Sequence, residues 1–207
     1  MGTWDDGLYD NDAALDLVGG LVRLPALDAS PSELAVGIGL VAWLQPVVLK
    51  LRGAGHVAAA LAHGEALPAD AREVLAGLAR DLEGALAGRS RSEAAAAAIG
   101  GYNDGPRFDA LLRVPGGQAS IDALGERAAA VLDRADDVDL YEAAGDFGAL
   151  GLVVELVDAG LWKPAPDRVA AWQARFDRAD AGTREERGFW DAYAVRVRLG
   201  FELALRA

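Results

Sequence analysis

The chain contains 44 alanines among its 207 residues, against three isoleucines and two threonines. Alanine has the highest intrinsic helix propensity, whereas isoleucine and threonine are typical of strands. No segment shows a sustained alternation of apolar and polar residues, which is the pattern of a half-buried strand. The sequence therefore predicts an all-α fold, a compact domain of about eight or nine helices without strands.

Helix start signals recur along the chain. Ser30-Pro31-Ser32-Glu33 combines a capping serine, a proline at the first helical position and a glutamate three residues after the cap. We expect that helix to kink or break at Pro46, and Asp139-Leu140-Tyr141-Glu142 begins another helix in the same way. The expected helices cover residues 10–22, 31–52, 55–63, 68–87, 91–99, 119–136, 139–159, 165–180 and 184–205.

The least helical stretch is residues 100–120, which hold five glycines and two prolines. The length of the chain suits one domain or two small ones. We expect a single helical domain over residues 1–207, because the helices on either side of this stretch need partners for their apolar faces. A sub-division at residues 100–120 is the alternative.

The formal net charge is −12 at pH 7, and it is unevenly distributed. Residues 1–33 sum to −6 and residues 133–146 sum to −5. A nucleic-acid binder needs clustered lysine and arginine, so we expect no nucleic-acid partner. The acidic stretches serve solubility and helix N-termini in the simplest interpretation, and a basic protein partner is the functional alternative.

Several compartments and chemistries are disfavoured by the sequence. The longest uncharged stretch, from Leu34 to Leu49, is shorter than the ~20 residues of a membrane span and contains Pro46. The acidic N-terminus lacks the apolar region of a secretory signal. The chain has no cysteine, which excludes disulfides, thiolate catalysis and cysteine-bound zinc. We therefore expect a cytoplasmic protein that does not contact membranes.

The densest run of carboxylates is Asp133-Arg134-Ala135-Asp136-Asp137-Val138-Asp139. Neighbouring carboxylates repel one another unless solvent or a cation such as Mg²⁺ or Ca²⁺ relieves the repulsion. A second acidic group lies at the start of the first expected helix and would add ligands if the two stretches converge. The plainer interpretation is helix capping and a solvated linker. The candidate metal ligands are Asp133, Asp136, Asp137, Asp10 and Asp12.

Other motifs carry little chemistry. Gly37-Ile38-Gly39-Leu40-Val41-Ala42 matches the G-x-G-x-x-A dinucleotide fingerprint, which requires a strand before the glycines. A helix cap precedes it instead, so the glycines indicate close helix packing. His56 and His63 lack the H-E-x-x-H pattern, and no serine lies in G-x-S-x-G. We assign no catalytic and no cofactor-binding residue.

The first 16 residues, MGTWDDGLYDNDAALD, resemble the opening of a bacterial family, domain-of-unknown-function family 4259. Its members begin roughly M-G-x-W-G-x-G-x-F-D-N-D-x-A-x-D. Gly2, Trp4, Gly7 and the Asp10-Asn11-Asp12 run fit this pattern, whereas Asp5 stands where the family has glycine. A weaker similarity covers residues 139–143. The resemblance implies a small helical domain, and the family has no established activity to transfer.

Together these observations favour a protein-binding or regulatory module with a basic protein partner, antitoxin-like or immunity-like in role. The alternative is a divalent-metal-dependent hydrolase that uses helical carboxylates. A homodimer with an interface at Trp162 or residues 100–120 is a third hypothesis. The sequence favours a binding protein over an enzyme without deciding between them.

Overall fold

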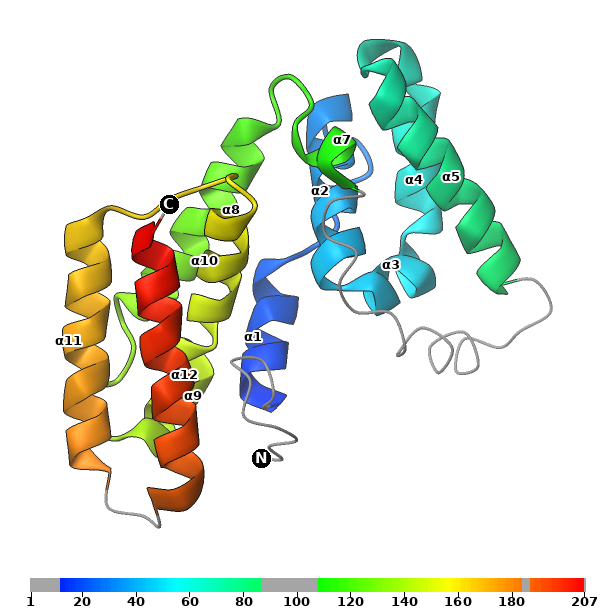
Figure 1. Ribbon diagram of the computed structural model, residues 1–207. Helices are drawn as coiled ribbons and strands as arrows, with labels where there is room; N and C mark the ends of the chain where they lie inside the picture. The colour runs from blue at the N-terminus through cyan, green and yellow to red at the C-terminus, as the bar shows by residue number, and fades with distance from the viewer. Residues whose placement is uncertain (1–11, 87–107, 184–186, 207) are drawn as a thin grey trace. The chain divides into compact units, whose positions relative to one another are not determined.

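The computed structural model describes residues 12–86, 108–183 and 187–206 (Figure 1). All regular structure within these ranges is helical, which confirms the all-α prediction. None of the helices described is both long enough and apolar enough to cross a membrane. The helices are α1 (Asp12–Leu21), α2 (Pro31–Leu44), α3 (Pro46–Arg52), α4 (Ala54–Ala62), the 3-10 turn η1 (Gly64–Ala66), α5 (Ala69–Leu86), α7 (Asp109–Leu112), α8 (Gln118–Leu132), α9 (Leu140–Phe147), α10 (Ala149–Asp158), α11 (Pro166–Gly182) and α12 (Arg187–Arg206).

The chain forms two compact units. The terminal unit combines residues 1–21 with residues 122–207, and the central unit consists of residues 22–121. Helix α8 begins in the central unit and continues in the terminal one. The boundary at residues 121 and 122 therefore lies just after the glycine- and proline-containing stretch 100–120, of which residues 100–107 lie outside the described ranges.

The central unit is built around α2, which is buried on nearly every side. The expected capping box at its start is present: the Ser30 side chain accepts from the Glu33 backbone N–H, and the Glu33 carboxylate accepts from the Ser30 backbone N–H. The helix ends at Leu44 and α3 begins at Pro46, so the predicted break at this proline is confirmed. Proline ends a helix here because it lacks the N–H that the preceding turn would use.

Gly39 on α2 allows the close packing against α7 that the glycines in the sequence indicate. A Cβ at this position would lie 2.9 Å from Cβ of Leu111 on α7, so only a residue without a side chain fits there. Helix α2 is continuous through the glycines, and no strand precedes them in the described residues. The G-x-G-x-x-A match is therefore a packing feature and lacks the strand–turn–helix geometry of a dinucleotide site.

The terminal unit places α10 and α11 against α12, which runs beside them (Figure 1). Its core contains an aromatic cluster in which the rings of Phe147, Phe176 and Phe201 meet edge to face, with centroids 5.1–6.5 Å apart. Tyr193 of α12 is buried and its hydroxyl donates to the Ala144 carbonyl of α9. This hydrogen bond satisfies the one polar atom that the ring carries into the core.

The single helix expected over residues 139–159 is wrong. The structure divides it into α9 and α10 at Gly148. The Gly148 N–H donates to the carbonyls of both Ala144 and Gly145, which tightens the last turn of α9. The division lets the two halves pack differently, since α9 lies against α1 and α11 whereas α10 lies mainly against α12.

Glu155, in the middle of α10, is partly buried, and no described residue of opposite charge forms an ion pair with it. Burial raises the pKa of its carboxyl, and the nearby charge of Asp158 raises it further. Because the folded pKa exceeds the unfolded one, ionising Glu155 costs stability above the folded pKa, and the cost disappears below the unfolded value of about 4.3.

We therefore expect Glu155→Gln to stabilise the protein at neutral pH by up to about 1 kcal/mol. The advantage should shrink as the pH falls toward 4, because the wild-type carboxyl then becomes neutral as well. Urea unfolding of both proteins at neutral and acidic pH measures this difference. A stabilisation that stays constant with pH would contradict the role assigned to the charge.

Candidate functional site in the acidic linker

The acidic linker, residues 133–139 between α8 and α9, contains the carboxylates that the sequence singled out. Asp133 is held by α11. Its carboxylate accepts hydrogen bonds from Nη2 of Arg168 at 2.6 Å and from the indole N–H of buried Trp172 at 2.7 Å. The Arg168 hydrogen bonds, followed by the weaker one from Trp172, hold the pKa of Asp133 below its usual value, although partial burial opposes this shift.

Arg168 joins α8 and the start of the linker to its own helix, α11. Its Nη1 donates to Glu126 of α8 at 2.7 Å, and its guanidinium carbon lies 5.6 Å from the centre of the Trp172 ring. The two carboxylates raise the pKa of Arg168 further above its already high value. The guanidinium is therefore a permanent cation that fixes the start of the linker to α11.

Asp137 has a second arginine partner on α11. Its Oδ2 accepts from Nε of Arg178 at 2.9 Å and lies 2.8 Å from Nη2 of the same residue. The positive charges of α11 thus lie opposite the negative charges of the linker. The sequence count of residues 133–146 overstates the unpaired acid, because the arginine partners of Asp133 and Asp137 come later in the sequence.

Asp136 and Asp139 form local hydrogen bonds. Oδ1 of Asp136 accepts from the Val138 backbone N–H at 2.7 Å, which makes a turn. Oδ1 of Asp139 accepts from the Glu142 backbone N–H at 3.0 Å, so the helix start predicted at Asp139 is confirmed as the cap of α9. Each of the four linker carboxylates therefore has a partner of its own.

The inner side of the linker is pressed onto the end of α11. A Cβ on Gly182 would overlap the carbonyl oxygen of Val138, so the two backbones approach as closely as a glycine allows. The Leu140 backbone N–H donates to Oγ1 of Thr183 at 3.0 Å, and that hydroxyl donates to the Ala179 carbonyl at 2.8 Å. These contacts are buried and fix the path of the linker.

Exposed side chains follow one another closely at the end of the linker and in the first turn of α9. Val138 is 67% exposed and Tyr141 is 50% exposed. Asp136 and Glu142 are exposed beside them in the sequence. We call these four residues the linker tip: Asp136, Val138, Tyr141 and Glu142.

The candidate metal ligands are only partly placed by the structure. Asp10 lies outside the described residues, and Asp12 begins α1 with a side chain that is not described. In the described ranges, no three histidine, cysteine, aspartate or glutamate side chains gather in a way that could hold a metal ion. The metal hypothesis stays a prediction, and thermal unfolding with Mg²⁺, Mn²⁺ or Ca²⁺ against a chelator tests it.

The residues proposed for a homodimer interface have partners within the chain. Trp162 is partly buried, and its ring occupies the space that a side chain at Gly125 of α8 would need. From the stretch 100–120, Phe108, Leu111 and Leu112 are buried. These apolar side chains serve the interior of their own units.

No family model, no curated protein and no solved structure matches this chain.

Proposed function

We propose that the protein is a protein-binding module and that the linker tip contacts a partner with a basic surface. The observation that carries the proposal is the contrast between the two sides of the acidic linker. Its inner side is fixed by ion pairs, a helix cap and a glycine contact, while Val138 and the adjoining Tyr141 of α9 are exposed to solvent.

A fixed loop suits binding because its conformational entropy is lost during folding, so that association does not have to order it. Tyrosine is among the residues that contribute most to protein interfaces, since its ring buries a large area and its hydroxyl still forms hydrogen bonds. Tyr141 and Val138 could therefore supply the apolar centre of such a contact.

The charge of the tip favours a basic partner. Arg168 and Arg178 neutralise Asp133 and Asp137, whereas Asp136 and Glu142 have no arginine or lysine partner in the described part of the chain. Exposed carboxylates around an apolar centre speed the approach of a positively charged surface and reject acidic ones. A neutraliser of a basic enzyme, as in antitoxin-like or immunity-like proteins, would use such a surface.

The test compares tagged variants in pull-downs from lysate of the source cells. We expect the double variant Val138→Ser/Tyr141→Ser to lose a co-purifying basic protein that the wild type retains. Val195→Ser is the matched control, because Val195 of α12 is 66% exposed and equally apolar. An unchanged set of bound proteins in the double variant, or loss in the control alone, would contradict the proposal.

The charge contribution is tested with Asp136→Asn/Glu142→Gln. Asparagine can still accept the hydrogen bond from the Val138 N–H, so the turn is kept. With the partner identified, we expect this variant to associate more slowly and to depend less on salt than the wild type. An unaltered salt dependence would show that the carboxylates do not face the partner.

A further inference from the structure

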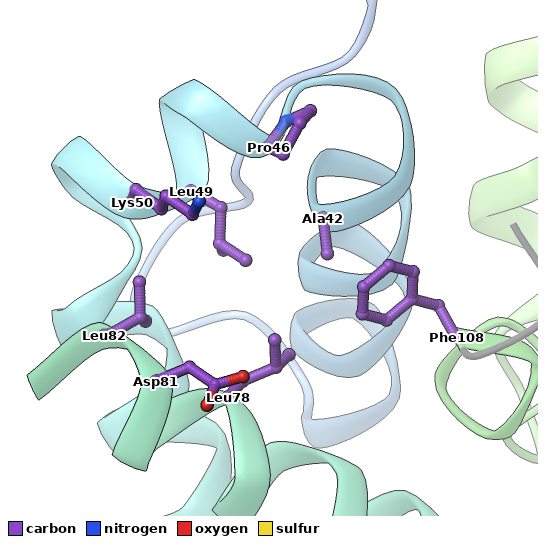
Figure 2. A pocket seen from close by; sticks show the side chains of 8 residues that line it. All are labelled: Ala42, Pro46, Leu49, Lys50, Leu78, Asp81, Leu82 and Phe108. Atoms are coloured by element: carbon purple, nitrogen blue, oxygen red, sulfur yellow. The ribbon is translucent and has the colours of Figure 1, made fainter. Parts of the chain in front are cut away.

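The central unit contains a small hollow between α2, α3 and α5, with a volume of about 60 Å³ (Figure 2). Its walls are apolar and come mainly from Ala42, Leu49, Leu78, Leu82 and Phe108. Drug-sized ligands and cofactors occupy about 300–1,000 Å³, so the hollow is too small for a nucleotide or a sugar. Its size and lining suit a short aliphatic group.

Two groups of opposite charge border the hollow. Lys50 comes from α3 and Asp81 from α5, and Figure 2 shows both side chains at the edge of the space that the apolar residues surround. Neither of them has an ion-pair or hydrogen-bond partner within the described ranges. Lys50 lies in the last turn of α3, where a positive charge interacts favourably with the helix dipole. Asp81 lies well inside α5, and its carboxylate is exposed to solvent at the mouth of the hollow.

We propose that this hollow binds a free α-amino acid with a short aliphatic side chain, such as valine. The side chain would fill the apolar space, the carboxylate would pair with the ammonium of Lys50, and the ammonium would pair with the carboxylate of Asp81. A zwitterion is the small ligand that satisfies a cation and an anion at one site. Hydrogen bonds between charged groups are stronger than those between neutral groups, and two such bonds would fix the orientation of the ligand.

Isothermal titration calorimetry of the full chain with a series of amino acids and their analogues tests this proposal. We expect valine, norvaline or leucine to bind with a dissociation constant in the millimolar range, since so small a ligand gains little contact area. Glycine lacks the side chain, isobutylamine lacks the carboxylate and isovalerate lacks the ammonium. Each should bind at least tenfold more weakly than valine. Equal binding of glycine, or no binding of any aliphatic amino acid up to 20 mM, overturns the proposal.

Two variants test the residues. Lys50→Met keeps the aliphatic stem and Asp81→Asn keeps the shape, so circular dichroism should show unchanged helix content. Each should weaken valine binding at least tenfold. Glu73→Gln is the matched control, because Glu73 is an exposed acid on α5 that does not line the hollow. Wild-type affinity in both pocket variants, or the same loss in the control, overturns the assignment.

Discussion

Gly182→Ala is expected to destabilise the terminal unit by about 3 kcal/mol, because overpacking of a well-packed site costs roughly 1–3 kcal/mol and more against rigid backbone. The added methyl group would overlap the carbonyl oxygen of Val138, and a backbone carbonyl cannot move aside by rotating a side chain. The linker has to shift outward. The buried hydrogen bond from the Leu140 N–H to Thr183 would then lengthen or break.

Urea unfolding followed by circular dichroism measures this loss, and Gly188→Ala is the matched control. Gly188 lies in the first turn of α12, and a Cβ there would meet nothing within 4 Å. Alanine has the higher helix propensity, so we expect the control to be neutral or stabilising by up to about 1 kcal/mol. Equal effects of the two substitutions would show that the linker does not require Gly182. If the linker tip binds a partner, Gly182→Ala should also weaken that binding.

Asp133→Ala is expected to cost about 2 kcal/mol, within the 1–3 kcal/mol range for leaving a buried donor without an acceptor. The donor is the indole N–H of Trp172, whose side chain is fully buried. Asp133→Asn should cost about 1 kcal/mol or less, because an amide oxygen still accepts from the indole and only the partly exposed ion pair with Arg168 is lost.

The pH dependence separates the two contributions. Asp133 has a lowered folded pKa, so its charge stabilises the protein above the unfolded pKa of about 3.9, and this stabilisation is lost as the pH falls through the folded value. The difference between wild type and Asp133→Asn should therefore be constant from neutral pH down to about 4 and shrink below it. Urea unfolding at pH 7 and near pH 3 measures it. If Asp133→Ala lowers the free energy of unfolding no more than Asp133→Asn does, the hydrogen bond to Trp172 is not the main contribution of Asp133 to stability.

Local signals predicted much of the helical framework. The Ser30 capping box, the break at Pro46 and the Asp139 cap each depend on residues within four positions, where the backbone itself sets the geometry. The separation of α9 and α10 was not predicted. Both halves are rich in apolar residues at helical spacing, so the pattern alone predicts one helix. The two helices differ in the helices against which they pack.

The candidate site shows the same limit. Sequence reasoning located the acidic linker and assigned the cap at Asp139, but it missed the arginines of α11. Arg168 reaches Asp133 across 35 positions, and Arg178 reaches Asp137 across 41. Arginines recurring along the helix that follows the acidic stretch were the available signal, although nothing local showed which face they occupy. The hollow beside Lys50 and Asp81 was also missed, since its walls come from α2, α3, α5 and Phe108, which are far apart in the sequence.

The sequence by itself determined the helical class and those helix ends that a local cap or a proline sets, because helix propensity and capping act within a single turn of backbone. Only the tertiary structure decided which carboxylates are neutralised, which glycine is required and which apolar side chains remain in solvent. Coulombic attraction and steric overlap depend on distance in space, and folding brings together residues that the sequence keeps tens of positions apart. The acidic linker thereby has an inner side whose ion pairs and hydrogen bonds stabilise the fold, while the side chain of Val138 remains exposed to solvent.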